Sequence, residues 1–181
     1  MNFVYESKRL TLKILTPDKA EDVLHFLYRN RYRFEPYEAE KPDSYYTLTY
    51  QRDNLKGEFN SFKHLKYIRF FVFKKGNDND IIGTISFSNI LSHPFSCATI
   101  GYKFDKDFLK LGYATEAVAC AILAVFRDLD LHRIEAYVMP NNTNSIKLLE
   151  RIGFEHEGLC HKNICICGKY EDHLRFSLIN N

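Results

Sequence analysis

The sequence predicts a mixed α/β (α+β) fold, in which an antiparallel series of strands runs into a β-α-β unit. Three observations support this fold class. Alternating apolar and polar residues indicate strands at 67–75, 81–90 and 97–104, with only short turns between them. A helical repeat of apolar residues covers 113–128. A further strand pattern follows at 133–139, so the long helix should connect two strands of one sheet.

The elements that precede this unit are a strand and two helices. Residues 9–15 alternate apolar and polar side chains and predict the first strand. Pro17 follows at a position that suits the first turn of a helix, and apolar residues then recur at helical spacing. A second, weakly amphipathic helix is expected over 44–64. Residues 76–80 are Gly, Asn and Asp only, which predicts a hairpin turn between two of the strands above.

The elements that follow it are a helix and a pair of strands. The helix is expected at 143–152. The strands are expected at 157–168 and 173–179, with residues 168–172 as their connection. The predicted order of elements is therefore β-α-α-β-β-β-α-β-α-β-β.

Composition and length are those of one ordinary globular domain, which we expect to cover residues 1–181. Hydrophobic residues make up 45% of the chain and charged residues 27%. The formal net charge of +2 does not require a nucleic-acid partner, and no specific DNA partner is expected. Basic residues do gather in the first half, at Arg29, Arg31 and Arg33 among others. A solvated charged face and a surface near ribosomal RNA are both open interpretations of this cluster.

We expect neither a membrane-spanning segment nor a metal-binding site. The N-terminus lacks the pattern of a signal peptide, and no run of about 18 apolar residues occurs. We therefore expect a cytoplasmic location with reduced thiols at all five cysteines. Only one residue separates Cys165 from Cys167, where zinc sites usually have two to four, so no metal is predicted. In a strand these two thiols would share one face.

The segment 132–158 is the most informative part of the chain. A strand is followed by a break at Pro140, and Asn142 offers a side-chain oxygen that can cap a helix. Ile146, Leu149 and Ile152 form the apolar side of that helix, and Gly153 is placed to end it.

This pattern of strand, Asn-x-x-Ser, helix and Gly-Phe resembles the closing half of the GCN5-related N-acetyltransferase (GNAT) superfamily. The sequence is similar to the RimJ/RimL-type ribosomal-protein alanine N-acetyltransferases, on the residues MPNNTNS and LLERIGFEHEG. The resemblance covers essentially the whole chain. It implies the GNAT-type acyl-CoA N-acyltransferase fold, a mostly antiparallel sheet with a splayed parallel strand pair and flanking helices. It also implies an acetyl-CoA-dependent N-acetyltransferase, with acetyl-CoA as co-substrate and no metal.

The expected cofactor site lies between strand 97–104 and helix 113–128. Gly112 permits a tight turn, and the free N–H groups of a helix start attract phosphate. The family's pyrophosphate loop reads Gln/Arg-x-x-Gly-x-Gly/Ala. Gly112 and Ala114 match it, Leu109 departs from its first position, and Lys110 offers a compensating charge. The cofactor-binding residues that the resemblance implies are Tyr102, Lys103, Phe104, Leu109, Lys110, Leu111, Gly112, Tyr113, Ala114, Asn142 and Ser145.

Acetyl transfer to an amine needs a neutral amine, a polarised thioester carbonyl and a proton for the departing thiolate. The resemblance places the hydroxyl of Ser145 near the thioester sulfur as the candidate proton donor, although a plain helix position is also open. Strand 97–104 contains no carboxylate that could serve as the base. Glu157 is the candidate base, with Glu35 and Asp172 as further carboxylates to test. For each, a surface or capping role is equally open.

The acceptor amine is expected to be a protein N-terminus. An α-amine with a pKa near 7.7–8.0 is roughly 10–15% neutral at pH 7, whereas a lysine amine is roughly 0.04% neutral. Deprotonating the lysine therefore costs about 3.5 kcal/mol more. This difference favours an α-amine where no strong base is evident.

The resemblance implies acceptor-side residues at Glu35, Tyr37, Ser88 and Asn89, and it matches Asp172-His173 to an Asp-His pair at the start of the final strand, which could also be a structural turn. Three functions stay open. The first is acetylation of the N-terminal alanine of a ribosomal protein, with the ribosome as a further candidate partner. The second is acetylation of a small amine such as a polyamine or an antibiotic. The third is a non-catalytic ribosome-assembly factor.

Overall fold

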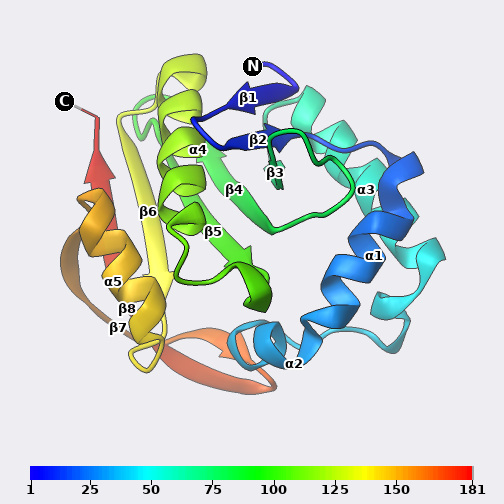
Figure 1. The fold of residues 1–181 in the computed structure, drawn as a ribbon. Coiled ribbons are helices and arrows are strands. Elements are labelled where there is room, and N and C mark those ends of the chain that lie inside the picture. The colour runs from blue at the N-terminus through cyan, green and yellow to red at the C-terminus, as the bar shows by residue number, and fades with distance from the viewer. Residues whose placement is uncertain (181) are drawn as a thin grey trace.

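One sheet of eight strands organises the molecule (Figure 1). The computed structural model describes residues 1–180. The strand order is β1-β2-β3-β4-β5-β6-β8-β7. All neighbouring strands are antiparallel except β5 and β6, which are parallel. The strands are β1 Val4–Glu6, β2 Leu10–Lys13, β3 Ile68–Lys74, β4 Gly83–Leu91, β5 Cys97–Phe104, β6 Arg133–Val138, β7 Glu155–Ile166 and β8 Lys169–Ile179.

Helices cover both faces of this sheet (Figure 1). The side chains of β3 alternate between the two faces. Phe70 and Val72 join the core cluster that contains residues of α4 and α5, whereas Phe71 and Phe73 join the cluster that contains residues of α1 and α3. The helices are α1 Ala20–Arg29, α2 Arg31–Phe34, α3 Leu48–Lys63, α4 Tyr113–Leu129 and α5 Thr143–Ile152, with short 3₁₀ turns η1 Pro17–Lys19, η2 Glu35–Tyr37, η3 Asp43–Tyr46 and η4 Lys106–Phe108.

Helices α4 and α5 start at residues suited to that position. The side-chain oxygen of Asn142 accepts a hydrogen bond from the backbone N–H of Ser145 at 3.3 Å, so Asn142 caps α5 as predicted. Gly153 ends α5 in the left-handed conformation, with φ at 100°. Gly112 precedes α4 with φ at 78°, a conformation that other residues rarely adopt.

The mixed α/β fold predicted from the sequence is confirmed, with strand β1 and the short helix α2 added. The sequence does not predict strand β1, because only three residues pair with β2 and only Tyr5 among them is buried. Three residues are too few to show a period of two. The strand expected to start at residue 81 starts at Gly83. Ile81 and Ile82 are buried in the core just before it, and this burial explains why their apolar side chains look like part of the strand in the sequence.

The predicted connection between the last two strands is wrong. Strands β7 and β8 are joined by Cys167 and Gly168 alone, both with positive φ, at 47° and 79°. A two-residue turn of this kind suits the twist of a hairpin. Residues 169–172 therefore belong to β8, and Asp172 and His173 lie inside the strand rather than at its start. Cys167 lies in the turn, so it does not share a strand face with Cys165.

The described part of the chain bears on the expectations for metal sites, cysteines and membrane-spanning helices. No group of three or more His, Cys, Asp or Glu side chains within residues 1–180 is arranged to hold a metal ion, and the five cysteines are free. None of the helices in this part of the chain is both long enough and apolar enough to cross a membrane.

Candidate active site

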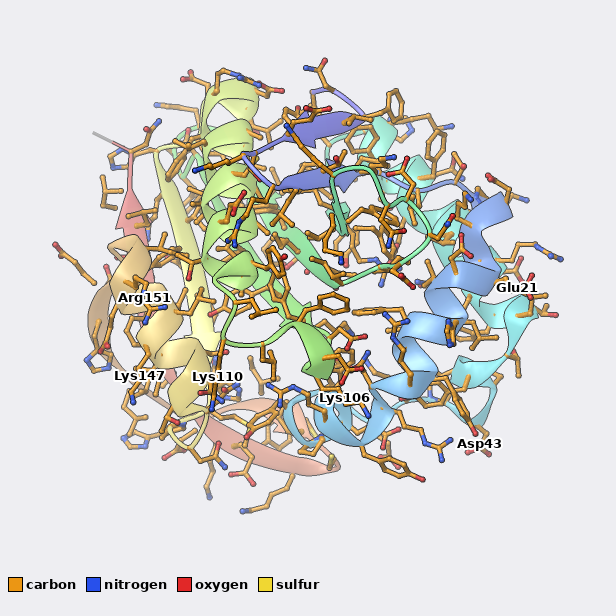
Figure 2. All side chains as sticks on the ribbon, viewed as in Figure 1. Glu21, Asp43, Lys106, Lys110, Lys147 and Arg151 are labelled. Carbon is orange, nitrogen blue, oxygen red and sulfur yellow. The ribbon has the colours of Figure 1, made fainter. Side chains whose placement is uncertain are left out.

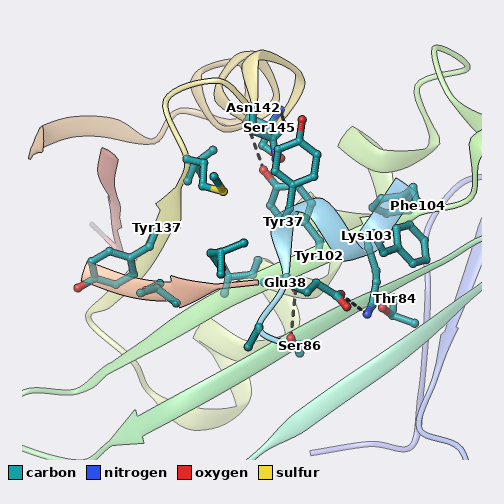
Figure 3. Close-up of a pocket in the computed structure, with 18 of the residues that line it drawn as sticks. Tyr37, Glu38, Thr84, Ser86, Tyr102, Lys103, Phe104, Tyr137, Asn142 and Ser145 are labelled. Atoms are coloured by element: carbon teal, nitrogen blue, oxygen red, sulfur yellow. Dashed lines mark hydrogen bonds and ion pairs between the residues drawn. The ribbon is translucent and has the colours of Figure 1, made fainter. Parts of the chain in front are cut away.

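A cleft opens in the sheet because the parallel strands β5 and β6 separate, as predicted. They pair only over 97–99 of β5 and 133–135 of β6. Residues 100–104 stay paired with β4 on one side but have no pairing with β6 on the other. The backbone groups on that side of β5 are free to bind a ligand. A cavity of about 810 Å³ occupies this region (Figure 3).

The loop that leads into α4 fits a pyrophosphate group. Lys110 and Gly112 both have left-handed backbone conformations, with φ at 60° and 78°. The backbone N–H groups of residues 112–115 have no hydrogen-bond acceptor within residues 1–180. They lie at the N-terminus of a 17-residue helix, whose dipole adds partial positive charge. Such a set of aligned donors binds phosphate oxygens.

Arg9, which immediately precedes β2, holds this loop in place. Its Nη1 donates to the carbonyl oxygen of Leu111 at 3.1 Å, and its Nε pairs with Glu116 at 2.6 Å. The guanidinium also lies over the ring of Tyr113, 4.5 Å from its centre. Arg9 thus places a cation beside the loop where Leu109 provides none, and Lys110 adds an exposed amine (Figure 2). The sequence did not reveal Arg9, because about a hundred residues separate it from the loop.

The start of α5 forms another wall of the cleft. The backbone N–H of Ser145 is bound by Asn142, and the Ser145 hydroxyl has no partner in the described part of the chain. Tyr102 of β5 donates its hydroxyl to the carbonyl oxygen of Ser145 at 3.2 Å and so bridges the cleft (Figure 3). Burial raises the pKa of Tyr102 to about 12, so this hydroxyl stays protonated at neutral pH.

The opposite wall is polar and includes a carboxylate that the sequence did not single out. Glu38 pairs with Lys103 of β5 (Figure 3). It also pairs with Lys41, at 3.2 Å. Burial acts to raise the pKa of Glu38, but the two lysines outweigh it and the pKa is lowered. Thr84 and Ser86 of β4 line the same wall. Glu38 comes directly after the predicted residue Tyr37, and that proximity was the only available signal.

The structure brings most of the predicted cofactor residues together. Those that line the cavity are Tyr102, Lys103, Phe104, Leu109, Ala114, Asn142 and Ser145, together with the predicted acceptor-side residue Tyr37. Those that form the exposed or half-buried loop between Leu109 and Ala114 are Lys110, Leu111, Gly112 and Tyr113.

Three predicted acceptor-side residues are not among those that line the cavity. Ser88 pairs with Thr99, at a level where β5 is still joined to β6 and the cleft has not opened. Asn89 is turned aside by a left-handed backbone, with φ at 50°, and donates to the Thr99 hydroxyl at 3.4 Å. Glu35 accepts a hydrogen bond from the hydroxyl of Tyr46 at 2.9 Å.

Glu157 and Asp172 are also absent from the residues that line the cavity. The Glu157 carboxylate is bound by Arg133 and, at 2.7 Å, by the hydroxyl of Ser177. Hydrogen bonds from Arg133 are the main reason that the pKa of Glu157 falls to about 2, which makes it a weak base. Arg133 pairs with Cys97, at the closed end of the parallel strand pair. The Asp172 carboxylate accepts a hydrogen bond from the backbone N–H of Lys162 in β7, at 2.8 Å.

Comparisons with known proteins agree with this geometry. Residues 9–155 match the acetyltransferase (GNAT) domain. The chain is 35% identical over 175 residues to the probable N-acetyltransferase YjcK of Bacillus subtilis (strain 168), covering 97% of this chain and 96% of that protein. It is 29% identical over 170 residues to the ribosomal protein uS5-alanine N-acetyltransferase of Escherichia coli (strain K12), covering 94% of this chain and 87% of that protein. The crystal structure of the ribosomal-protein-S5-alanine acetyltransferase from Vibrio fischeri superposes with a TM-score of 0.92 at 31% identity, covering 99% of this chain and 98% of that one.

Proposed function

This chain belongs to the GNAT acetyltransferase family and is an acetyl-CoA-dependent N-acetyltransferase, and we propose that it acetylates the α-amine of a protein N-terminus. The acceptor we propose is a ribosomal protein that begins with alanine. Two relatives named for that activity, from Escherichia coli and Vibrio fischeri, match nearly the whole chain. The proposal places the reaction in the cytoplasm, where ribosomal proteins are made.

The observation that carries this proposal is that the cavity reaches both faces of the sheet. Ala114 and Leu148 line it on the α4/α5 face, and Glu38 and Thr84 line it on the α1/α3 face. The gap between β5 and β6 connects the two sides. The volume of the cavity, about 810 Å³, lies in the upper part of the range for ligand sites, about 300–1,000 Å³. Two substrates can therefore meet in the gap from opposite faces.

The residues of the α4/α5 face hold the thioester. Backbone N–H groups of residues 112–115 bind the pyrophosphate, and Arg9 fixes the loop that presents them. The unpaired backbone of residues 100–104 binds the amides of the pantetheine arm. Acetyl-CoA, once bound, supplies the activated acetyl group. The hydroxyl of Ser145 supplies the proton that the departing thiolate needs.

The residues of the α1/α3 face suit the end of a peptide better than a polyamine. Glu38 is neutralised by Lys103 and Lys41, and Glu58 is paired with Arg69 at 2.6 Å. A polycation would therefore find these two carboxylates already paired. A peptide end brings one amine together with amide groups, which can hydrogen-bond to polar side chains such as Thr84 and Ser86.

A peptide with a free N-terminal alanine and one internal lysine tests the proposal. The purified chain is incubated with acetyl-CoA and this peptide, and fragment-ion mass spectrometry locates the acetyl group. The controls are the same peptide with a blocked N-terminus, and spermidine. We expect a mass increase of one acetyl group at the α-amine only. Faster acetylation of spermidine or of the lysine side chain would refute the proposed acceptor.

A further inference from the structure

His173 is a buried group that the mechanism above does not use. It lies on β8, is 3% exposed and lines the cavity. It alternates along β8 with Leu174 and Phe176, which pack toward α4 and α5. The His173 side chain therefore faces the other way, toward the α1/α3 side on which we place the acceptor.

The hydrogen bond of His173 fixes which ring nitrogen carries the hydrogen. Nδ1 lies 3.0 Å from the carbonyl oxygen of Glu171. A carbonyl oxygen can only accept, so Nδ1 is the donor. In the neutral ring the lone pair is then at Nε2. Nε2 has no hydrogen-bond partner among residues 1–180, although the ring is almost fully buried against the cavity.

The strand segment next to His173 is anchored to β7. A carboxylate oxygen of Asp172 accepts a hydrogen bond from the backbone N–H of Lys162 at 2.8 Å. That bond joins β8 to the irregular part of β7 between Cys160 and Ile164, where the register shifts. This anchor and the hydrogen bond from Nδ1 to Glu171 together hold the imidazole in place, which a proton acceptor requires in order to meet a substrate repeatedly in one geometry.

Several other titratable groups that line the cavity are engaged by neighbouring groups. Burial raises the pKa of Glu58, but Arg69 pairs with its carboxylate at 2.6 Å. Glu38 is bound by two lysines, and its pKa is lowered. Tyr137 donates its hydroxyl to Glu135 at 2.9 Å, and burial raises its pKa. Tyr102 donates to a backbone carbonyl. Imidazole is the side chain whose ordinary pKa lies closest to neutral pH, where a general base works best.

We propose that Nε2 of His173 is the general base that deprotonates the acceptor amine. Nε2 takes one proton from the ammonium group, which leaves a neutral amine and an imidazolium. The amine nitrogen then forms a bond to the thioester carbonyl carbon as the carbon–sulfur bond breaks. A second proton leaves the nitrogen and reaches the sulfur through the Ser145 hydroxyl, which accepts one proton and gives one. The imidazolium returns its proton to water.

This inference rests on acetyl transfer to an amine, and not on which amine is used. The assay therefore takes whichever acceptor the wild-type enzyme acetylates fastest and measures release of the coenzyme A thiol. A wrong acceptor class would overturn the proposed function and leave the test of His173 intact.

The test compares His173→Gln, His173→Ala and the control His25→Gln. Glutamine keeps an N–H donor for the carbonyl of Glu171 but cannot take a proton at neutral pH. His25 is exposed on α1 and does not line the cavity, so its replacement should leave kcat unchanged. We expect kcat to fall about 100-fold or more in both His173 variants, with the Kd of acetyl-CoA within threefold of wild type. Added imidazole should restore His173→Ala by tenfold or more, and substituted imidazoles of higher pKa should restore it further.

Two results would overturn the proposal. One is a kcat for His173→Gln above one tenth of the wild-type value. The other is a loss of kcat that imidazole does not restore while Tm falls in parallel, since that pattern belongs to a residue that only supports the fold.

Discussion

Replacing Gly112 with valine tests where the pyrophosphate binds. Gly112 has φ at 78°, and a Cβ there would lie 3.3 Å from Nη2 of Arg9. A left-handed backbone costs a residue with a Cβ about 1–2 kcal/mol, so the loop should shift. Each N–H group that turns away from a phosphate loses a charge-assisted hydrogen bond, worth about 1.5–3 kcal/mol. We expect the Kd of acetyl-CoA to rise roughly 10- to 100-fold.

Gly76→Val is the matched control. Gly76 also has φ at 78° and lies in the turn after β3, where a Cβ would have no other atom within 4 Å. Both variants should lose a similar free energy of unfolding, about 1–2 kcal/mol in urea titrations. Only Gly112→Val should weaken acetyl-CoA binding in calorimetry. Leu109→Ala should weaken it less, because Leu109 has no side-chain donor to lose. If Gly112→Val binds acetyl-CoA within threefold of wild type, the pyrophosphate does not lie at this loop.

Three further substitutions probe the rest of the site. Ser145→Ala should lower kcat about 100-fold or more while the Kd of acetyl-CoA stays near wild type; an unchanged kcat would make Ser145 a helix residue only. Glu157→Gln should keep wild-type kcat but lose stability at neutral pH. The folded-state pKa of Glu157 is lowered from 4.5 to about 2, so the wild-type protein loses this stability as pH falls through that interval. In an acid titration, the free energies of unfolding of wild type and Glu157→Gln should therefore become equal below about pH 2. Glu38→Gln should destabilise the fold by leaving Lys103 buried without its partner, and the double variant Glu38→Gln/Lys103→Met should recover much of the lost stability. Equal Tm values for wild type, the single variant and the double variant would contradict this.

The parts of the site that the sequence predicts are those encoded by neighbouring residues. Asn142, Ser145 and Gly153 act within one helix, so their spacing along the chain contains their geometry. The turn at Gly112 is likewise local, since it needs only a residue that tolerates positive φ next to the helix.

The parts that the sequence does not predict depend on pairings across the sheet. Arg9 meets Glu116 only because β2 and α4 pack together. Glu38 pairs with Lys103, although 65 positions separate the two residues in the sequence. Ser88 lies beside the closed part of the β5–β6 pair, and the level at which these strands separate cannot be read from either strand alone. His173 lies inside β8 rather than at its start because Cys167, which is no usual turn residue, adopts positive φ.

The measurement that tests the central claim most directly is mass spectrometry of ribosomal-protein N-termini from cells with and without this chain. We predict that at least one ribosomal protein that begins with alanine is Nα-acetylated in the first cells and bears a free amine in the second. Restoring the wild-type chain should restore the acetyl group, and restoring Ser145→Ala should not. Identical N-terminal acetylation of all ribosomal proteins in both kinds of cell would contradict the account.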